Sequence, residues 1–127
     1  MAVKYLNQHF FKDNEHIHTF FCSANRKEQM HFHEFWELSY VYEGFGKNRT
    51  HSQVENVSAD DFLLISPGME HSFSSLPKKA QTRLCNCLIT KKYFDAVFKQ
   101  YSVIHGLHHL SPQWKRSYRN HEQALRP

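Results

Sequence analysis

Short β-prone runs separated by turn residues fill residues 29–90, and this spacing restricts the possible folds more than any other feature of the sequence. The runs are rich in aromatic and β-branched side chains and are shorter than ordinary helices. They occupy residues 29–42, 48–57, 62–65, 71–73 and 82–89. Their spacing is typical of an all-β barrel or sandwich. We therefore predict an all-β core of about six short strands.

Turn residues separate these runs at 43–46, 58–61 and 66–68. Glycine adopts a positive φ without steric cost, so we expect Gly44 to close a hairpin between the runs on either side of it. Two aromatic segments precede the core, at residues 5–11 and 16–22. Both segments predict additional strands on the sheet.

After residue 90 the apolar period changes from that of a strand to that of a helix. Apolar residues recur at intervals of three and four, at Tyr93, Phe94, Val97, Phe98, Tyr101 and Ile104. This pattern predicts one amphipathic helix over residues 91–110, packed either on the strands or on a second subunit. Residues 111–127 have few aliphatic side chains and are expected to be a tail or a truncated linker. The predicted organisation is one β domain over residues 1–90, then this helix and this tail.

Four histidine and glutamate side chains have the spacing of a metal site. His31, His33 and Glu37 share one face of a continuous strand, because side chains alternate along it. His71 lies on a later strand, which a barrel would place beside the first. Imidazole and carboxylate groups suit one divalent Zn, Ni, Fe, Mn or Cu ion, and the set does not choose among them. The alternative is a hydrogen-bonded polar cluster that lines a ligand cavity without metal.

Other side chains near this set have two interpretations each. Phe35 shares the histidine face and either stacks on a bound molecule or is ordinary core. Cys85 and Cys87 lie on one face of their strand, where they either add thiolates to a metal or, as we predict, pack as small core residues. No convincing general acid or base is identified beside the metal candidates, although Glu43 and Tyr42 near the predicted hairpin stay open, so no catalytic residue is predicted.

Two motifs in this region resemble those of a known family. The spacing His31-x-His33-x3-Glu37-x6-Gly44 resembles the first cupin motif, and residues 60–71 resemble the second. The surrounding segments HFHEFWELSYVYEGFG and DDFLLISPGMEHSF are similar to the sensor-domain signature of AraC-type transcription regulators. The resemblance covers roughly residues 16–98. Two positions depart from it: Asp60 stands where the family usually has glycine, and Ser75 stands where enzymatic cupins often carry asparagine.

The resemblance implies a small cupin-type β-barrel, a double-stranded β-helix or jelly roll, followed by one C-terminal α-helix. It implies a domain that binds a small-molecule effector, often a sugar, inside the barrel and forms a homodimer through the helix. The expected ligand-binding residues are His31, His33, Phe35, Glu37 and His71, and the expected metal ligands are His31, His33, Glu37 and His71. DNA contact would require a downstream pair of helix-turn-helix units, which these residues do not supply.

Two other functions stay open at this level. One is a small metal-dependent cupin enzyme, such as an isomerase, a lyase or a dioxygenase, in which an ion with an open position polarises the substrate or O2. The other is a dimerisation cupin with a vestigial pocket. Activity that is lost on chelation would favour the enzyme, and the absence of both ligand and metal would favour the dimerisation domain.

Composition predicts a cytoplasmic protein. No stretch reaches the roughly 18 apolar residues that a membrane helix needs, and the first residues contain no charged-then-apolar signal. The 3 cysteines are odd in number, which is typical of reduced thiols in an intracellular protein. The formal charge of +4 comes from scattered basic residues and indicates no nucleic-acid surface.

Overall fold

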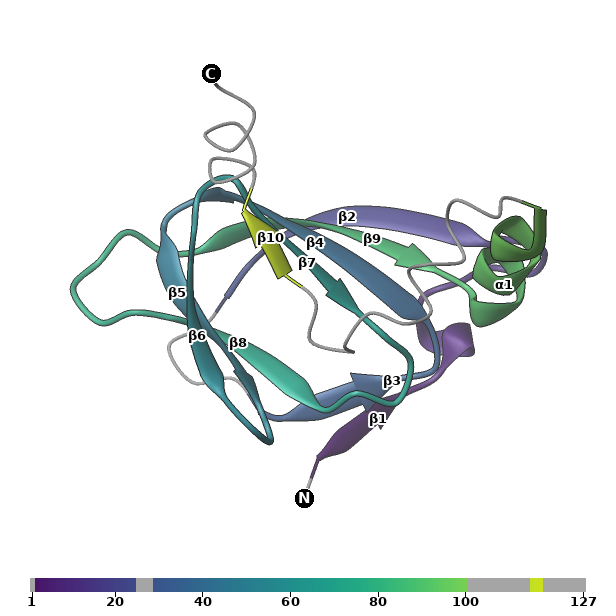
Figure 1. Cartoon of the computed structure of the whole chain (residues 1–127), viewed down its shortest axis with the longest axis horizontal. Helices are drawn as coiled ribbons and strands as arrows, with labels where there is room; N and C mark the ends of the chain where they lie inside the picture. The colour runs from purple at the N-terminus through teal and green to yellow at the C-terminus, as the bar shows by residue number, and fades with distance from the viewer. Residues whose placement is uncertain (1, 25–28, 101–114, 118–127) are drawn as a thin grey trace.

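The computed structural model describes residues 2–24, 29–100 and 115–117, which form two facing five-stranded sheets and a helix (Figure 1). Sheet A contains, in spatial order, β1 (Val3–Tyr5), β3 (His31–His33), β8 (His71–Ser75), β5 (Phe45–Thr50) and β6 (Val54–Ser58). Sheet B contains β10 (Lys115–Ser117), β7 (Asp61–Ile65), β4 (Trp36–Glu43), β9 (Arg83–Ile89) and β2 (Ile17–Ser23). A short 3-10 helix, η1 (Asn7–His9), and the helix α1 (Lys91–Gln100) complete the described elements. The predicted all-β core with one following helix is confirmed.

The chain changes sheet at nearly every turn of the core. Gly44, Asp60 and Gly68 lie at three of these corners, and their φ angles are 90°, 76° and 82°. The hairpin predicted at residues 43–46 is wrong, because β4 and β5 belong to different sheets. Glycine is required at this corner, since a Cβ on Gly44 would overlap the backbone carbonyl of Gln81. A positive-φ glycine is therefore compatible with a crossing between sheets and with a hairpin, and it does not distinguish the two.

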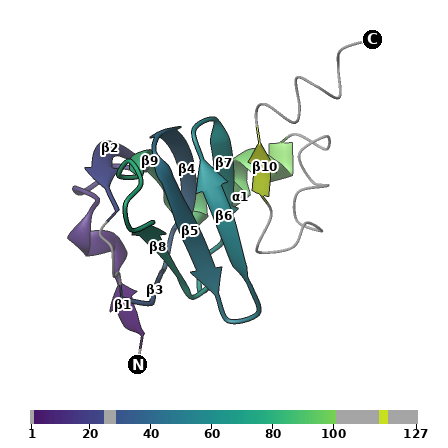
Figure 2. The same ribbon diagram turned by 90° about the vertical axis from the view of Figure 1, so that its left-hand side faces the viewer.

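Two predicted strands are each divided in the structure. Residues 29–42 are interrupted at Glu34 and Phe35, so that β3 lies in sheet A and β4 in sheet B. Residues 48–57 contain the end of β5 and the start of β6, which pair as a hairpin (Figure 2). The hairpin turn at residues 51–53 is closed by a hydrogen bond from the Thr50 N–H to the Gln53 carbonyl, at 2.9 Å. The turn contains neither glycine nor proline, so the usual turn signals are missing and the turn was not predicted.

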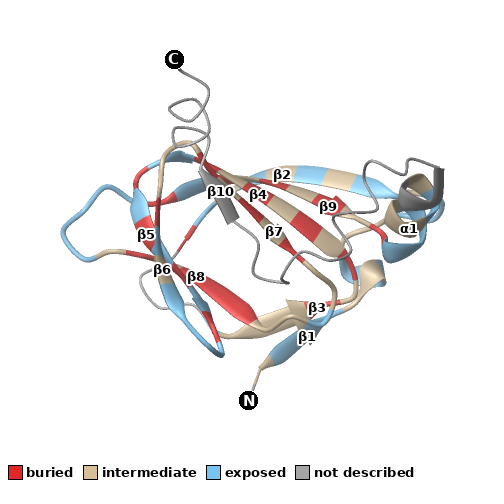
Figure 3. Ribbon diagram, viewed as in Figure 1, coloured by how far each residue is buried: buried red, intermediate tan, exposed pale blue. Residues whose placement is uncertain are grey.

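Alternation along the strands of sheet B places one set of side chains between the sheets. Buried and half-buried residues alternate along β4 and β9 (Figure 3), and Val41 and Leu84 are among the buried core residues. Cys85 and Cys87 take the opposite face of β9, where both are half-buried. The prediction that these two cysteines are core residues is therefore wrong, and they point away from the space between the sheets.

Some of the predictions for the segments before and after the core are confirmed, and others are wrong. Residues 16–22 form β2 as predicted, whereas residues 5–11 contain the end of β1 and then η1 rather than a full strand. Helix α1 begins at Lys91, and Phe94 stacks on Trp36 of β4 with ring centroids 4.0 Å apart. The rest of the predicted helix, residues 101–110, lies outside the described residues. Of the predicted tail, Lys115–Ser117 forms β10 and pairs with β7.

The sheets face each other without closing into a continuous barrel. Among the described strands, every pairing lies within sheet A or within sheet B. Within the described residues, no helix is long and apolar enough to cross a membrane.

Candidate functional site

Three side chains from three strands converge between the sheets. His33 ends β3, Glu37 lies near the start of β4, and His71 begins β8. The Nε2 atom of His33 lies 2.8 Å from Glu37 Oε2 and 3.2 Å from His71 Nε2. His71 Nε2 lies 3.5 Å from the same carboxylate oxygen. All three side chains are almost completely buried.

The strand break at residues 34 and 35 is what allows this convergence. On a continuous strand, His33 and Glu37 would share one face of one sheet but lie about 13 Å apart, too far for contact. In the structure they come from opposite sheets, and the interior lies between them. The two residues therefore share an interior as predicted, but they do so from two facing sheets and not from one continuous strand.

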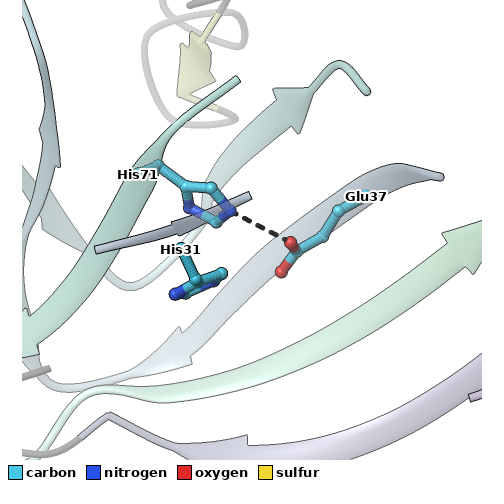
Figure 4. A group of neighbouring side chains, drawn as sticks. All are labelled: His31, Glu37 and His71. Atoms are coloured by element: carbon cyan, nitrogen blue, oxygen red, sulfur yellow. Dashed lines mark ion pairs between the residues drawn. The ribbon is translucent and has the colours of Figure 1, made fainter. Parts of the chain in front are cut away.

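His31 completes the group of residues that the sequence singled out. It pairs with His71 across β3 and β8, and their ring centroids are 4.4 Å apart. His31, Glu37 and His71 each offer a ligating atom, and these atoms lie within 4.8 Å of one another (Figure 4). The side chains of His31 and His71 both point toward the Glu37 carboxylate in that view.

Phe35 fixes the orientation of His33 in two ways. Its ring stacks on the imidazole at 4.4 Å with an interplanar angle of 2°. Its backbone carbonyl accepts a hydrogen bond from His33 Nδ1, at 2.6 Å. A carbonyl oxygen only accepts, so the Nδ1 atom carries a proton. The Nε2 atom then either carries a second proton that it donates to Glu37, or presents its lone pair to the centre of the cluster.

The lone-pair arrangement fits a divalent metal ion. Ligand atoms about 2.1 Å from a shared ion lie about 3.0–3.4 Å apart in octahedral or tetrahedral geometry. The three distances that join His33, Glu37 and His71 run from 2.8 to 3.5 Å. Two or more imidazoles with one carboxylate are also the donor set that zinc and other transition metals bind. The side chains present therefore fit a metal ion, and they equally fit an ion pair without one.

Glu37 is held in its ionised form. Burial alone would raise the pKa of its carboxyl group, but hydrogen bonds from His33 and His71, and the positive charge on these rings, hold the pKa well below its ordinary value. Ser39 lies on the same face of β4, and its hydroxyl lies 3.0 Å from Glu37 Oε1 and 2.7 Å from Asn86 Oδ1. Ser39 and Asn86 were not predicted from the sequence, although strand alternation from Glu37 places Ser39 on the inner face.

A cavity of about 270 Å³ opens beside this cluster. Of the five predicted ligand-binding residues, His31, His33, Phe35 and Glu37 line it, and His71 lies behind them in the cluster. The remaining lining comes from residues that the sequence analysis did not single out: Tyr5, Phe10, Phe20, Cys22, Ser23, Ala24, Gln29, Phe73, Leu84, Asn86 and Leu88. Tyr5 and Phe10 belong to the N-terminal segment, which the structure folds against the histidine end of the cavity.

The sequence from residue 7 to residue 124 matches the family model of the AraC-like ligand binding domain. The chain belongs to this family. No curated protein sequence matches this AraC-like domain.

Solved structures similar to the AraC-like domain include a cupin domain. A cupin-2 domain containing protein from Shewanella frigidimarina is 17% identical, with a TM-score of 0.51, and the match covers 56% of this chain and 68% of that one. A putative ethanolamine utilization protein Q from Salmonella typhimurium is 18% identical (TM-score 0.51; 61% and 60% covered). Apo ToxT from Vibrio cholerae is 12% identical (TM-score 0.53; 69% and 35% covered). At these identities the likeness establishes the cupin-type fold alone.

Proposed function

We propose that this AraC-like domain senses a small molecule that binds in the cavity between the two sheets. The cavity itself carries this proposal, because it lies inside a domain of a ligand-binding family and is lined by His31, His33, Phe35 and Glu37. Concave sites with mostly apolar walls and a few convergent polar groups are the usual form of small-molecule sites. A sugar is one candidate effector.

The proposal also covers the parent regulator, its DNA-binding domain and its dimer. The domain acts within an AraC-type transcription regulator in the cytoplasm, and DNA is bound by a separate helix-turn-helix domain. A homodimer forms through the helical segment that begins with α1. Ligand binding changes regulation only if the two states of the regulator differ in ligand affinity. The stack of Phe94 on Trp36 joins α1 to β4 one residue before Glu37, which supports a route from the cavity to the helix.

A second candidate function rests on the metal-binding geometry of His31, Glu37 and His71. In this alternative the domain is a small cupin enzyme, such as an isomerase, a lyase or a dioxygenase. His31, His33, Glu37 and His71 would hold one divalent Zn, Ni, Fe, Mn or Cu ion. A bound ion would supply Lewis-acid polarisation of a substrate oxygen or activation of O2. Stoichiometric metal and a turnover product would favour this alternative.

The ligand-sensing proposal is tested by a thermal-shift screen of sugars and other small metabolites. A specific ligand raises the unfolding temperature of the wild-type domain, because it binds the folded state. Cys22 lines the cavity, so Cys22→Phe fills part of it and removes the shift. Cys85→Phe makes the same change on the outer face of β9 and keeps the shift. A library that produces no cavity-dependent shift would contradict the proposal.

A further inference from the structure

The polar side chains of the cavity wall and those directly behind them form one connected group. Glu37 joins His33 and His71 through its Oε2 atom and the Ser39 hydroxyl through its Oε1 atom. Ser39 in turn contacts Asn86, which also lines the cavity. His31 lies beside His71 in the same group. We call these six residues the polar cluster.

The rest of the buried wall is apolar. It consists of aromatic rings, aliphatic side chains and one thiol, from Phe10, Phe20, Phe35, Phe73, Leu84, Leu88, Ala24 and Cys22. The other polar residues of the lining, Tyr5, Ser23 and Gln29, are solvent-exposed. A bound molecule therefore meets buried hydrogen-bonding groups on one part of its surface only.

The volume of the cavity restricts the size of this molecule. An apolar cavity of about 150 Å³ holds one benzene molecule. The cavity here is about 270 Å³, which by proportion accommodates on the order of ten to twelve non-hydrogen atoms. A single substituted ring has this size.

From this distribution of polar and apolar wall we propose that the cavity takes a compact aromatic or similarly apolar molecule with one hydroxyl or amine group, which hydrogen-bonds to the polar cluster. The inference rests on the proposed ligand-sensing function and narrows its ligand class. It replaces the sugar that the family resemblance implies.

A free sugar suits this wall poorly. Its hydroxyl groups are distributed around the whole ring, and each one that is buried against phenylalanine or leucine loses its hydrogen bonds to water without a replacement. A molecule with one polar end places that end against Glu37 and its remaining surface against the aromatic wall. The rings of Phe10, Phe20 and Phe35 then provide edge and face contacts for a bound ring.

The class is tested with phenethyl alcohol, ethylbenzene and glucose as probes, by calorimetric titration of the intact domain. We expect phenethyl alcohol to bind the wild-type domain with a Kd at least about tenfold lower than that of either other probe. Glu37→Met removes the carboxylate oxygens at similar length and brings the alcohol and ethylbenzene to equal affinity. Should Glu37→Met fail to fold by circular dichroism, Asn86→Leu provides the same comparison from the other side of the polar cluster.

Each contrary result has a separate meaning. Glucose that binds as tightly as phenethyl alcohol, and is lost in Cys22→Phe, overturns the ligand class and leaves the ligand-sensing function in place. Equal wild-type affinity for ethylbenzene and phenethyl alcohol, or no binding of the alcohol, also overturns the class. If, in addition, no metabolite of the screen shows cavity-dependent binding, the sensing function fails as well.

Discussion

Replacement of Gly44 by alanine tests the corner between β4 and β5, at the end of β4 opposite to Glu37. A Cβ on Gly44 would overlap the Gln81 carbonyl and lie 2.8 Å from the Ala80 carbonyl oxygen. Both oxygens belong to backbone that leads into β9, and the Ala80 oxygen accepts a hydrogen bond from the Phe45 N–H at 3.1 Å. The overlap cannot be relieved by rotation of a side chain, so the corner has to move away from this segment.

The expected cost has three contributions. The positive φ of Gly44 costs about 1–2 kcal/mol for alanine. Loss of the Phe45 hydrogen bond costs about 1 kcal/mol, and the backbone displacement adds about 1–3 kcal/mol. We therefore expect Gly44→Ala to lower the free energy of unfolding by about 4 kcal/mol, a large part of the stability of a small domain.

Gly68→Ala is the matched control for this prediction. Gly68 has a similar positive φ of 82°, but no atom lies within 4 Å of the position of its Cβ. Only the conformational cost remains, about 1–2 kcal/mol. Urea denaturation followed by circular dichroism measures both variants. Equal losses of stability would refute the argument, because they would show that the Gly44 corner does not approach the segment before β9.

Further expectations concern the polar cluster and the helix. Ser39→Ala removes a hydroxyl from between Glu37 and Asn86 and should cost about 1–3 kcal/mol in urea denaturation, whereas Ser74→Ala on the outer side of β8 should cost much less. Because the pKa of Glu37 is lowered in the folded state, its ionised form contributes stability above the ordinary carboxyl pKa of about 4.3 that is lost as the pH falls. Denaturation curves between pH 6 and 3 should therefore show a smaller loss of stability for Glu37→Gln than for the wild type. Phe94→Ala removes the ring stacked on Trp36 and should lower stability by about 2 kcal/mol and reduce the helical circular-dichroism signal, whereas an unchanged spectrum would contradict the role of this contact. If the enzyme alternative holds, elemental analysis should find one metal ion per wild-type chain and none in the His31→Ala, His71→Ala double variant.

Strand content and the start of the helix could be predicted because they depend on local patterns. Alternation and β-branched residues mark the strands, and the apolar period that includes Phe94 marks α1. Gly44 also has the positive φ that was predicted for it. The assignment of each strand to a sheet was not predictable in this way, because it depends on pairing between distant segments. The hairpin expected at Gly44 failed for this reason.

The candidate site could be predicted in part. His31, His33, Glu37 and His71 were found from their spacing and from the family motifs, and the structure brings them together. The assumed continuous strand was wrong, because the break at Phe35 depends on packing of that ring in the interior. The contributions of Tyr5 and Phe10 to the cavity wall depend on how the N-terminal segment folds back over β3, which no local pattern in the sequence records.

The measurement that tests the central claim most directly is a two-dimensional NMR titration of the labelled domain with the best compound from the metabolite screen. If the cavity is the sensing site, saturable shifts should concentrate on lining residues such as Ala24, Leu84 and Leu88, and on the imidazole signals of His31 and His33. The outer-face residues Cys85 and Cys87 should respond weakly. Saturable shifts confined to the outer faces of the sheets, with the cavity residues unchanged, would contradict the claim that the domain senses its ligand between the two sheets.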